Sequence, residues 1–415
     1  MNTLCSLLLL GSGLAALASG PAIAAAGASR PVAPVAPSAE TRSAPVSTAD
    51  GINARLLSIA QEVAGAIPID PHVKDRSRAQ QQIFETRLAL GDLAGARASI
   101  EPMETWRRGF AFATLANAAA RRNDPVEAER MLDLAQAEAA GNEEWRRDRI
   151  LIEIAKVREF LGQSARAREL ETGVDPAEAG KVDSVRVELE SAEKFDERMQ
   201  SLDAVIATRA FDSTKSACDA LIKMHRRYFG DTERRTRTEQ SIRMAAVQLP
   251  VVDQIGLQFA LAANASSARA FVAATANLDE AAKLLDGNRW LPEDRLPLLA
   301  RLAEERHAAG QTEAAASCAA AALAFYTAER PNIVDVFRAA ALRPLAEAYA
   351  AMGDRAAALA VYRLAAEDGS LNPNARPRAL DLSATCCSMA LHAVEPDAEL
   401  WETLREIQRR LGPPW

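Results

Sequence analysis

One spacing of apolar and small residues recurs five times along the chain, and it restricts what the chain can fold into. Each copy has an apolar pair, a turn residue seven to eight positions later, and an alanine five positions beyond the turn. A turn glycine lets the backbone leave a helix with a positive φ, and a small residue lets the next helix pack closely. The spacing therefore predicts antiparallel helical hairpins. The copies are Ile83-Phe84 with Gly91 and Ala96, Leu115-Ala116 with Asn123 and Ala128, Ile154-Ala155 with Gly162 and Ala167, Leu302-Ala303 with Gly310 and Ala315, and Leu345-Ala346 with Gly353 and Ala358.

Two of these units are similar over a longer stretch, which indicates a duplicated hairpin. Residues 103–132 align with residues 142–170 at a shift of 39 positions, so that Trp106-Arg107-Arg108 falls on Trp145-Arg146-Arg147. A single helical hairpin cannot bury its own apolar face and needs neighbouring hairpins. The duplication therefore predicts an α-solenoid of stacked antiparallel hairpins.

Composition agrees with an all-α fold. Of the 415 residues, 49% are hydrophobic and only 5% are aromatic, and the commonest types, Ala, Leu, Glu and Arg, favour helices. The one alternating stretch, Val185 to Leu189, is too short to support a sheet.

The clearest unit resembles the tetratricopeptide repeat (TPR) family, and it matches at Leu345, Ala346, Tyr349, Gly353, Ala358, Tyr362 and Ala365. The resemblance implies a TPR-like superhelix whose concave face is lined by the first helix of each hairpin. Carried over by position, the groove residues would be Asn117, Arg121, Lys156, Arg343 and Glu347. An Asn and basic side chains in one groove could hold a peptide backbone or a carboxylate. Ordinary exposed polar positions on helices are the alternative interpretation.

The N-terminus has the pattern of an export signal. No charge occurs from Leu4 to Ala28, leucines come first, and small residues that suit a cleavage site follow. We expect a signal peptide over residues 1–26, with an uncleaved N-terminal anchor as the alternative. The protein would then be a bacterial periplasmic or secreted protein, or one tethered to the membrane by this segment alone.

The rest of the chain divides by pattern. Residues 27–51 are rich in Pro, Ala and Ser and predict a disordered linker. Residues 52–180 carry TPR-like repeats, residues 181–290 read as degenerate helical hairpins, and residues 291–411 carry further repeats and a C-terminal helix. A separate helical domain in the middle region is the alternative.

Catalytic and metal motifs are missing from the sequence. His72, His225, His307 and His392 have no partner at metal-ligand spacing, and we interpret them as surface or interface residues. There is no phosphate-binding loop, GxSxG, HExxH or CxxC motif. We expect no cofactor, no metal and no enzymatic activity. Cys218, Cys318, Cys386 and Cys387 could form disulfides in an exported protein, but buried thiols are the favoured interpretation.

The charge balance disfavours nucleic acid as a partner. The net charge is −7 and the pI is about 5.4, whereas a nucleic-acid binder needs a basic surface. One local exception runs from Lys223 to Arg243 and contains Arg226, Arg227, Arg234, Arg235 and Arg237. These arginines could form a basic patch for an acidic partner or anionic lipid, or they could be a solvated turn between charged helices.

Together these features predict an exported helical-repeat protein that binds a peptide or protein along a concave groove, as a scaffold or assembly factor. An enzyme of the (α/α)-toroid class and a self-associating structural envelope protein are the alternatives. A closed, aromatic-lined cavity would favour the enzyme. An open polar groove would favour the binder, and exposed apolar terminal hairpins would favour self-association.

Overall fold

The structure is a computed structural model that describes residues 48–415. Within this range the chain is all-α and contains no strand, which confirms the predicted fold class. The helices are α1 (Thr48–Ala66), α2 (Ile69–Ala89), α3 (Leu93–Ile100), α4 (Arg107–Arg121), α5 (Pro125–Ala140), α6 (Glu144–Phe160), α7 (Ser164–Glu171), α8 (Pro176–Ala179), η1 (Gly180–Val182), α9 (Asp183–Leu189), η2 (Ala192–Lys194), α10 (Phe195–Ala207), α11 (Phe211–Arg227), α12 (Thr232–Ala246), α13 (Val251–Ser267), α14 (Phe271–Asp286), α15 (Pro292–Ala308), α16 (Thr312–Glu329), η3 (Arg330–Asn332), α17 (Asp335–Ala351), α18 (Arg355–Ser370), α19 (Ala375–Leu391) and α20 (Ala398–Arg409).

The five predicted hairpins are present as the pairs α2–α3, α4–α5, α6–α7, α15–α16 and α17–α18. Their turn residues have positive φ, for example 81° at Gly353 and 60° at Asn123. The Asp that follows three of these turn residues accepts a hydrogen bond from the first turn of the next helix, as Asp354 does from the amide of Ala357. The alanine after each turn, such as Ala358, is fully buried. Each of the five copies of the spacing therefore forms a helical hairpin, as predicted.

A sixth hairpin, α13–α14, has the same design with a different turn residue. Arg269 takes the left-handed conformation at φ 58°, and Leu261-Ala262 and Ala274 stand at the same offsets as in the other five units. A non-glycine residue in this conformation costs about 1–2 kcal/mol. The regular pattern therefore continues into the middle region, where α11 and α12 also pack as a pair.

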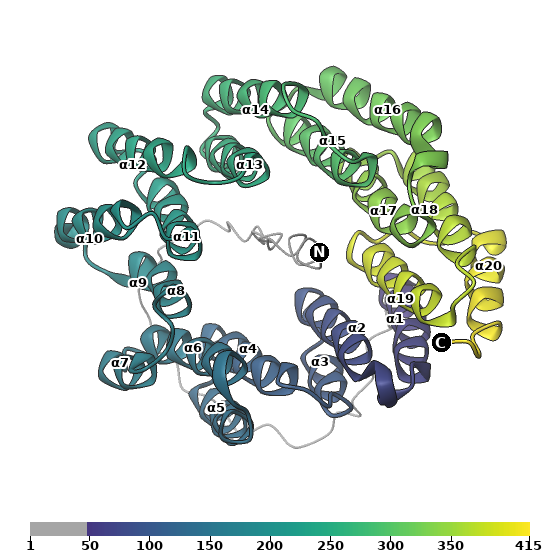
Figure 1. The fold of residues 1–415 in the computed structure, drawn as a ribbon, viewed down its shortest axis with the longest axis horizontal. Helices are drawn as coiled ribbons and strands as arrows, with labels where there is room; N and C mark the ends of the chain where they lie inside the picture. The colour runs from purple at the N-terminus through teal and green to yellow at the C-terminus, as the bar shows by residue number, and fades with distance from the viewer. Residues whose placement is uncertain (1–47) are drawn as a thin grey trace, which may run out of the picture.

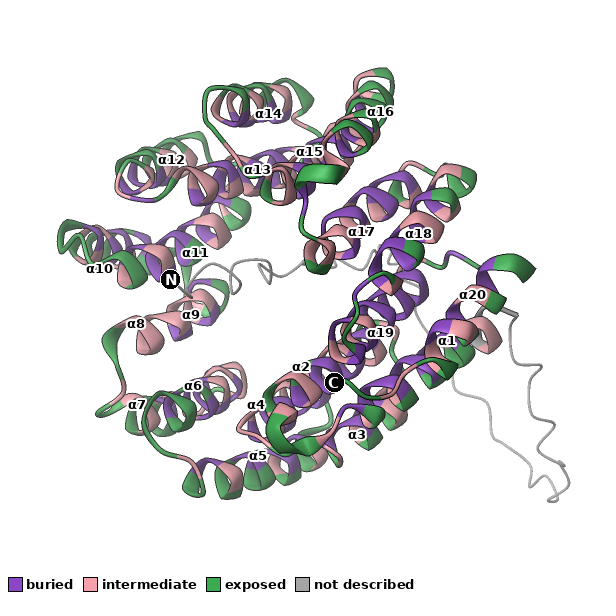
Figure 2. Cartoon of the chain, turned by 45° about the vertical axis from the view of Figure 1, so that its right-hand side comes forward, coloured by how far each residue is buried: buried purple, intermediate pink, exposed green. Residues whose placement is uncertain are grey.

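The inner helices form a closed ring (Figure 1). Contacts run in the order α2, α4, α6, α9, α11, α13, α15, α17 and α19, and α19 packs on α2 again. Helices α5, α7, α10, α12, α14 and α16 lie on the outside. Buried residues occupy the sides where helices face one another, while exposed residues follow the outer helices (Figure 2). The middle region contributes α9, α11 and α13 to this ring, between α6 and α15.

The ring closes where the two ends of the described chain meet. Helix α1 packs on α19 and α20, and Leu56, Ile67 and Leu404 are fully buried in the apolar core of this region. Each such side chain contributes about 1.5–3 kcal/mol. The guanidinium of Arg55 lies 4.1 Å from the ring centroid of Trp401. The repeat array therefore has no free terminal hairpin among residues 48–415.

The described structure begins inside the segment that the sequence predicts to be a linker. Helix α1 begins at Thr48, so the predicted linker, 27–51, extends too far; no proline after Pro45 interrupts the helix there. The predicted signal, 1–26, and the linker as far as residue 47 lie outside the described residues. Of helices α1 to α20, none has the combined length and apolar character that a membrane span requires.

Candidate functional site

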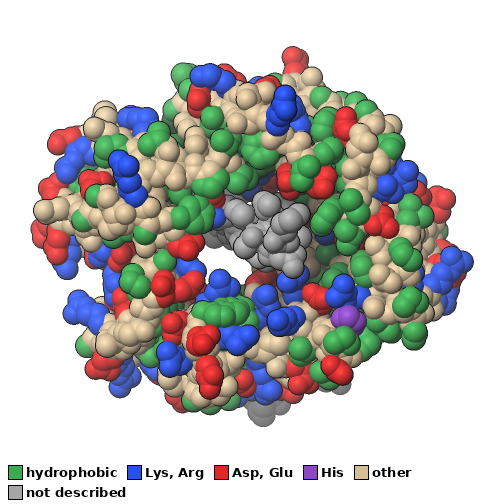
Figure 3. Space-filling model, viewed as in Figure 1, with side chains coloured by type: hydrophobic (Ala, Val, Ile, Leu, Met, Phe, Trp, Pro, Cys, Tyr) green, Lys and Arg blue, Asp and Glu red, His purple; other side chains and the backbone are tan. Residues whose placement is uncertain are grey.

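The inner face of α4 and α6 carries a stripe of partly exposed side chains that recurs between the two helices. Helix α4 packs on α2, α3, α5 and α6, which leaves one face uncovered. In Figure 3, hydrophobic side chains flanked by Lys and Arg lie over these helices, beside the opening at the middle of the ring. We call this face the α4–α6 stripe. It consists of Phe110, Thr114, Asn117 and Arg121 on α4, and of Arg149, Glu153, Lys156 and Phe160 at equivalent positions 39 residues later on α6.

At one end of the stripe, arginine and tryptophan side chains alternate in a ladder: Arg107, Trp106, Arg149, Trp145, Arg146. The guanidinium carbon of Arg149 lies 5.5 Å from the Trp106 ring centroid and 5.1 Å from that of Trp145. Arg107 lies 4.9 Å from Trp106, and Arg146 lies 5.1 Å from Trp145. The two indoles meet edge to face, with centroids 5.5 Å apart. We call these five residues the Arg–Trp ladder.

The ladder holds positive charge that nearby carboxylates do not fully balance. Arg149 pairs with Glu178 at 3.7 Å, but among the described residues no carboxylate oxygen lies within 4 Å of Arg107 or Arg146. Arg107 donates instead to the amide oxygen of Gln81. Burial and the neighbouring Arg78 lower the pKa of Arg107, against the opposing charge of Glu85. The indole of Trp145 remains 45% exposed, so this charge is next to accessible apolar surface.

Farther along the stripe, the predicted groove residues Asn117, Arg121 and Lys156 lie on adjacent helices. Arg121 donates to the side-chain oxygen of Asn117 at 3.2 Å, and its guanidinium carbon lies 4.8 Å from the ring centroid of Phe160. Lys156 pairs with Glu153 at 2.6 Å. The structure thus brings three of the five predicted groove residues together on one arc of the ring.

The other two predicted groove residues, Arg343 and Glu347, are elsewhere. They belong to α17, which α2 and α19 separate from α4 on the shorter way around the ring. Arg343 bonds to Asp381 at 3.0 Å, and Glu347 accepts from the hydroxyl of Ser388 at 2.6 Å. Both bonds join α17 to α19. These two residues therefore lie on a different arc from the other three and bond to a neighbouring helix, and their part in a shared groove stays a prediction.

The predicted basic patch, Arg226, Arg227, Arg234, Arg235 and Arg237, lies on α11 and α12. Arg227 donates to the backbone carbonyl of Val187 at 2.5 Å, and Arg237 pairs with Asp196 at 2.5 Å. Arg234 and Arg235 each lie 5.0 Å from an aromatic ring centroid, of Tyr228 and Phe229 respectively. Arg226 is exposed. Four of the five side chains thus make intramolecular contacts, and binding of an acidic partner or lipid at this patch stays a prediction.

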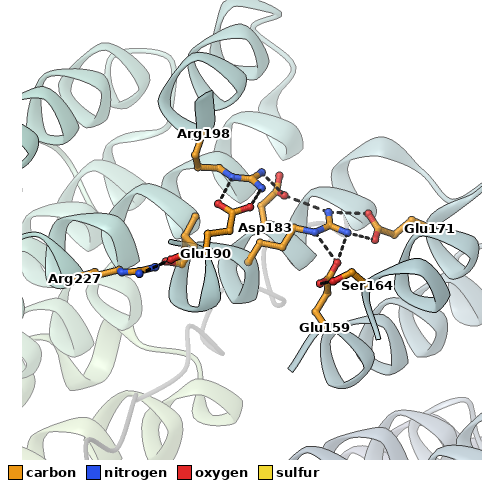
Figure 4. A network of polar contacts seen from close by, with 9 residues as sticks. Glu159, Ser164, Glu171, Asp183, Glu190, Arg198 and Arg227 are labelled. Atoms are coloured by element: carbon orange, nitrogen blue, oxygen red, sulfur yellow. Dashed lines mark hydrogen bonds and ion pairs between the residues drawn. The ribbon is translucent and has the colours of Figure 1, made fainter. Parts of the chain in front are cut away.

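Between α6 and α11, a polar network replaces the regular hairpin packing (Figure 4). Arg186 pairs with Glu159 at 2.8 Å and also with Glu171. Arg198 pairs with Asp183 at 2.7 Å and also with Glu190. The apolar cluster beside this network is small. We call this link the α6–α11 joint. The sequence does not predict this network, because most of its charged residues lie in short helices without a repeat pattern.

His225 and three of the four described cysteines are buried in this fold. His225 is buried between α11, α12 and α13; its Nδ1 accepts from the amide of Asn264 at 3.1 Å, and its Nε2 lies 3.3 Å from Glu239. Cys218, Cys386 and Cys387 are buried, Cys318 is half-buried, and all four are unpaired, in agreement with the thiol interpretation. Burial raises the pKa of the Cys218 and Cys387 thiols to about 12. Among residues 48–415, no group of His, Cys, Asp and Glu forms a metal site.

The fold and the stripe define an all-α protein of stacked helical hairpins, closed into a ring, with an aromatic and cationic inner face on one arc. No protein-family model matches the chain, and no curated protein matches it.

Proposed function

We propose that this protein is an exported, TPR-like scaffold or assembly factor that binds a peptide or protein partner along the inner face of its ring. The observation that carries the proposal is the α4–α6 stripe, where partly exposed aromatic side chains lie beside polar and charged ones on two adjacent helices. Such a stripe can contact successive side chains of an extended chain, while Asn117 and Lys156 are able to bond its backbone and carboxylates.

The hollows of the described surface favour an extended partner over a small molecule. Two hollows of the described surface, one beside Asp381 and one beside Arg198, have volumes of about 10 Å³, roughly the space of one water molecule. Pockets for small ligands are usually about 300–1,000 Å³. A partner that spreads along a helix face does not need an enclosed pocket.

Site-specific photo-crosslinking tests the proposal. A photoreactive amino acid is introduced at Thr114 or Asn117 on the stripe, and in a matched variant at Asp133, which is exposed on the outer helix α5. Crosslinking in the source organism should give one reproducible protein adduct from the stripe positions and none from Asp133. The same adduct from both faces, or no adduct from the stripe, would contradict the proposal.

One observation keeps the toroid enzyme as a second candidate. The ring is closed, and Trp106, Trp145 and Phe160 provide aromatic rings on its inner arc. Aromatic stacking surfaces suit sugars, and Glu153 is a carboxylate on the same stripe. Release of reducing ends from envelope polysaccharides, abolished in a Glu153→Gln variant, would replace the binding proposal with an enzymatic one.

The self-associating alternative depends on free repeat ends, and the fold gives it less support. The terminal helices α1 and α20 bury Leu56 and Leu404 in the ring-closing core instead of leaving an apolar end for stacking. A concentration-dependent polymer in light scattering would restore this alternative.

A further inference from the structure

We infer that the Arg–Trp ladder is the docking point for an acidic peptide segment that also carries apolar side chains. The inference rests on the proposed function and names the chemistry of its partner. Carboxylates of the segment would bond the guanidiniums of the ladder, and its apolar side chains would cover the exposed edge of Trp145.

The duplication explains how such a site forms. Trp106 precedes the first turn of α4, and Trp145 stands 39 residues later in the first turn of α6. Neighbouring hairpins stack side by side, so the two copies of Trp-Arg-Arg come into contact. Arg149, one turn farther along α6, lies against both indoles. The result is a continuous surface over two helices rather than two isolated residues.

Charge at the ladder favours an anionic partner. Arg146 is exposed and stacks on Trp145 without a carboxylate within 4 Å among the described residues. Arg107 lies close enough to Arg78 and Arg149 for their positive charges to oppose its own. The N-cap residues of α4 and α6 make no capping side-chain hydrogen bond, although the hydroxyl of Thr105 accepts from the amide of Arg107 at 3.4 Å, and a helix N-terminus carries about half a positive charge. A carboxylate placed here would relieve repulsion as well as gain charge-assisted hydrogen bonds.

Features beside the ladder favour a peptide over a uniform polyanion. Glu143 and Glu144 are exposed next to Trp145, and they would repel a chain that carries a charge on every unit. The whole protein also has a net charge of −7. A peptide can place its carboxylates over Arg107 and Arg146 and its uncharged residues beside the glutamates, whereas a nucleic acid or sulfated polysaccharide cannot.

Fluorescence titration of the full chain tests the inference. The probe is a synthetic peptide of four Phe-Glu-Gly repeats, compared with four Phe-Lys-Gly repeats, a twelve-nucleotide oligo(dT) and heparin. We expect the glutamate peptide to bind, with weaker binding as salt increases, and to change the tryptophan emission because two indoles line the site. Tighter binding of heparin or oligo(dT), equal binding of the lysine peptide, or no binding of the glutamate peptide would overturn the inference.

Matched variants locate the site. The triple variant Arg107→Gln, Arg146→Gln, Arg149→Gln should weaken binding of the glutamate peptide by about tenfold or more. The control triple, Arg122→Gln, Arg166→Gln, Arg289→Gln, removes three exposed arginines of equal charge outside the ladder and the basic patch, and it should bind like the unaltered chain. Because Arg149 and Arg107 also bond protein groups, Arg146→Gln alone serves as a variant that keeps the fold, and it should weaken binding about threefold. Equal effects of both triples, or unchanged binding in Arg146→Gln, would overturn the inference.

The crosslinking experiment separates this inference from the proposed function. If the stripe gives a protein adduct that the ladder variants do not reduce, the inference fails and the proposed function stands. If the stripe gives no adduct, the proposed function fails, and the ladder would then lack a biological partner even if the probe binds.

Discussion

Arg55 of α1 lies over the indole of Trp401 of α20, with its guanidinium carbon 4.1 Å from the ring centroid, and this contact joins the two ends of the described chain. Around it, Gln408 donates to Glu62 at 2.7 Å and Arg376 pairs with Asp75 at 3.1 Å. These contacts convert a linear stack of hairpins into a ring. The ring in turn gives the α4–α6 stripe an enclosed position beside the central opening (Figure 3).

Truncating Trp401 should loosen the closure more than removing its cationic partner. Trp401 is 7% exposed, so Trp401→Ala should cost about 3–5 kcal/mol through the cavity it leaves. Arg55→Ala removes mainly the stacking contact and should cost about 1 kcal/mol. Hydrogen exchange measured by mass spectrometry should show faster exchange in α1 and α20 first. Loss of protection spread evenly over α4 to α16 would contradict this assignment.

The α6–α11 joint should depend on its central arginine. Arg186→Ala leaves Glu159, which is 7% exposed, without its charge partner, and such a change typically costs about 3–5 kcal/mol. Arg168→Ala, at an exposed position on the adjacent α7, should change the free energy of unfolding by less than about 0.5 kcal/mol. Urea denaturation of both variants measures the difference. Equal midpoints would show that the network does not hold the joint.

Stability should fall as the pH drops below neutral because of His225. Burial lowers the pKa of His225 below its ordinary value of 6.5, despite the nearby Glu239. As the pH falls, the imidazole of His225 therefore takes up a proton in the unfolded chain at a higher pH than in the folded chain. Its contribution to the free energy of unfolding is present above about pH 6.5 and is lost as the pH falls from there through the pKa of the folded state. Urea midpoints at pH 7.5 and pH 5.5 should differ less in His225→Gln than in the unaltered chain. The half-buried His392→Gln serves as the control, and an unchanged pH dependence in His225→Gln would contradict the assignment.

A turn glycine should resist substitution for conformational reasons alone. Gly353 has φ 81° and open space where a Cβ would stand, so Gly353→Ala meets no clash. The left-handed backbone should still cost about 1–2 kcal/mol. Gly230, which also has open space but no positive φ, is the matched control, and Gly230→Ala should be within about 0.5 kcal/mol of the unaltered chain. Equal thermal denaturation temperatures for the two variants would refute the role of the turn.

Individual helical hairpins could be predicted from the sequence. The spacing of Leu345, Gly353 and Ala358 predicts one hairpin because each residue acts on its immediate neighbours. The α13–α14 hairpin was not predicted because its turn residue is Arg269 and not glycine. The tertiary packing of the two helices outweighs the local preference for glycine at this turn. The duplicated Trp-Arg-Arg was visible, but its ladder geometry depends on how two hairpins stack.

Contacts between helices far apart in the sequence could not be predicted from the sequence. Closure of the ring depends on the packing of α1 and α2 against α19 and α20, which lie at opposite ends of the sequence and share no pattern. The predicted groove residues also depend on contacts between helices that the sequence does not reveal. Asn117 and Lys156 occupy equivalent positions on adjacent helices and come together, whereas Arg343 aligns with the buried Ala113 and bonds to α19. Position within a repeat predicts which face a residue occupies, but not whether a neighbour covers it.

Crosslinking of the two ends tests the closed ring most directly. In a Cys318→Ala background, Glu62→Cys and Gln408→Cys are joined with a short bismaleimide, and Glu62→Cys with Arg243→Cys on the distant α12 is the control pair. The account predicts a fast intramolecular crosslink for the first pair only, in dilute protein, seen as a shifted band on denaturing gels. No intramolecular crosslink between Glu62→Cys and Gln408→Cys, or equal crosslinking of both pairs, would contradict a ring in which α1 and α2 pack on α19 and α20.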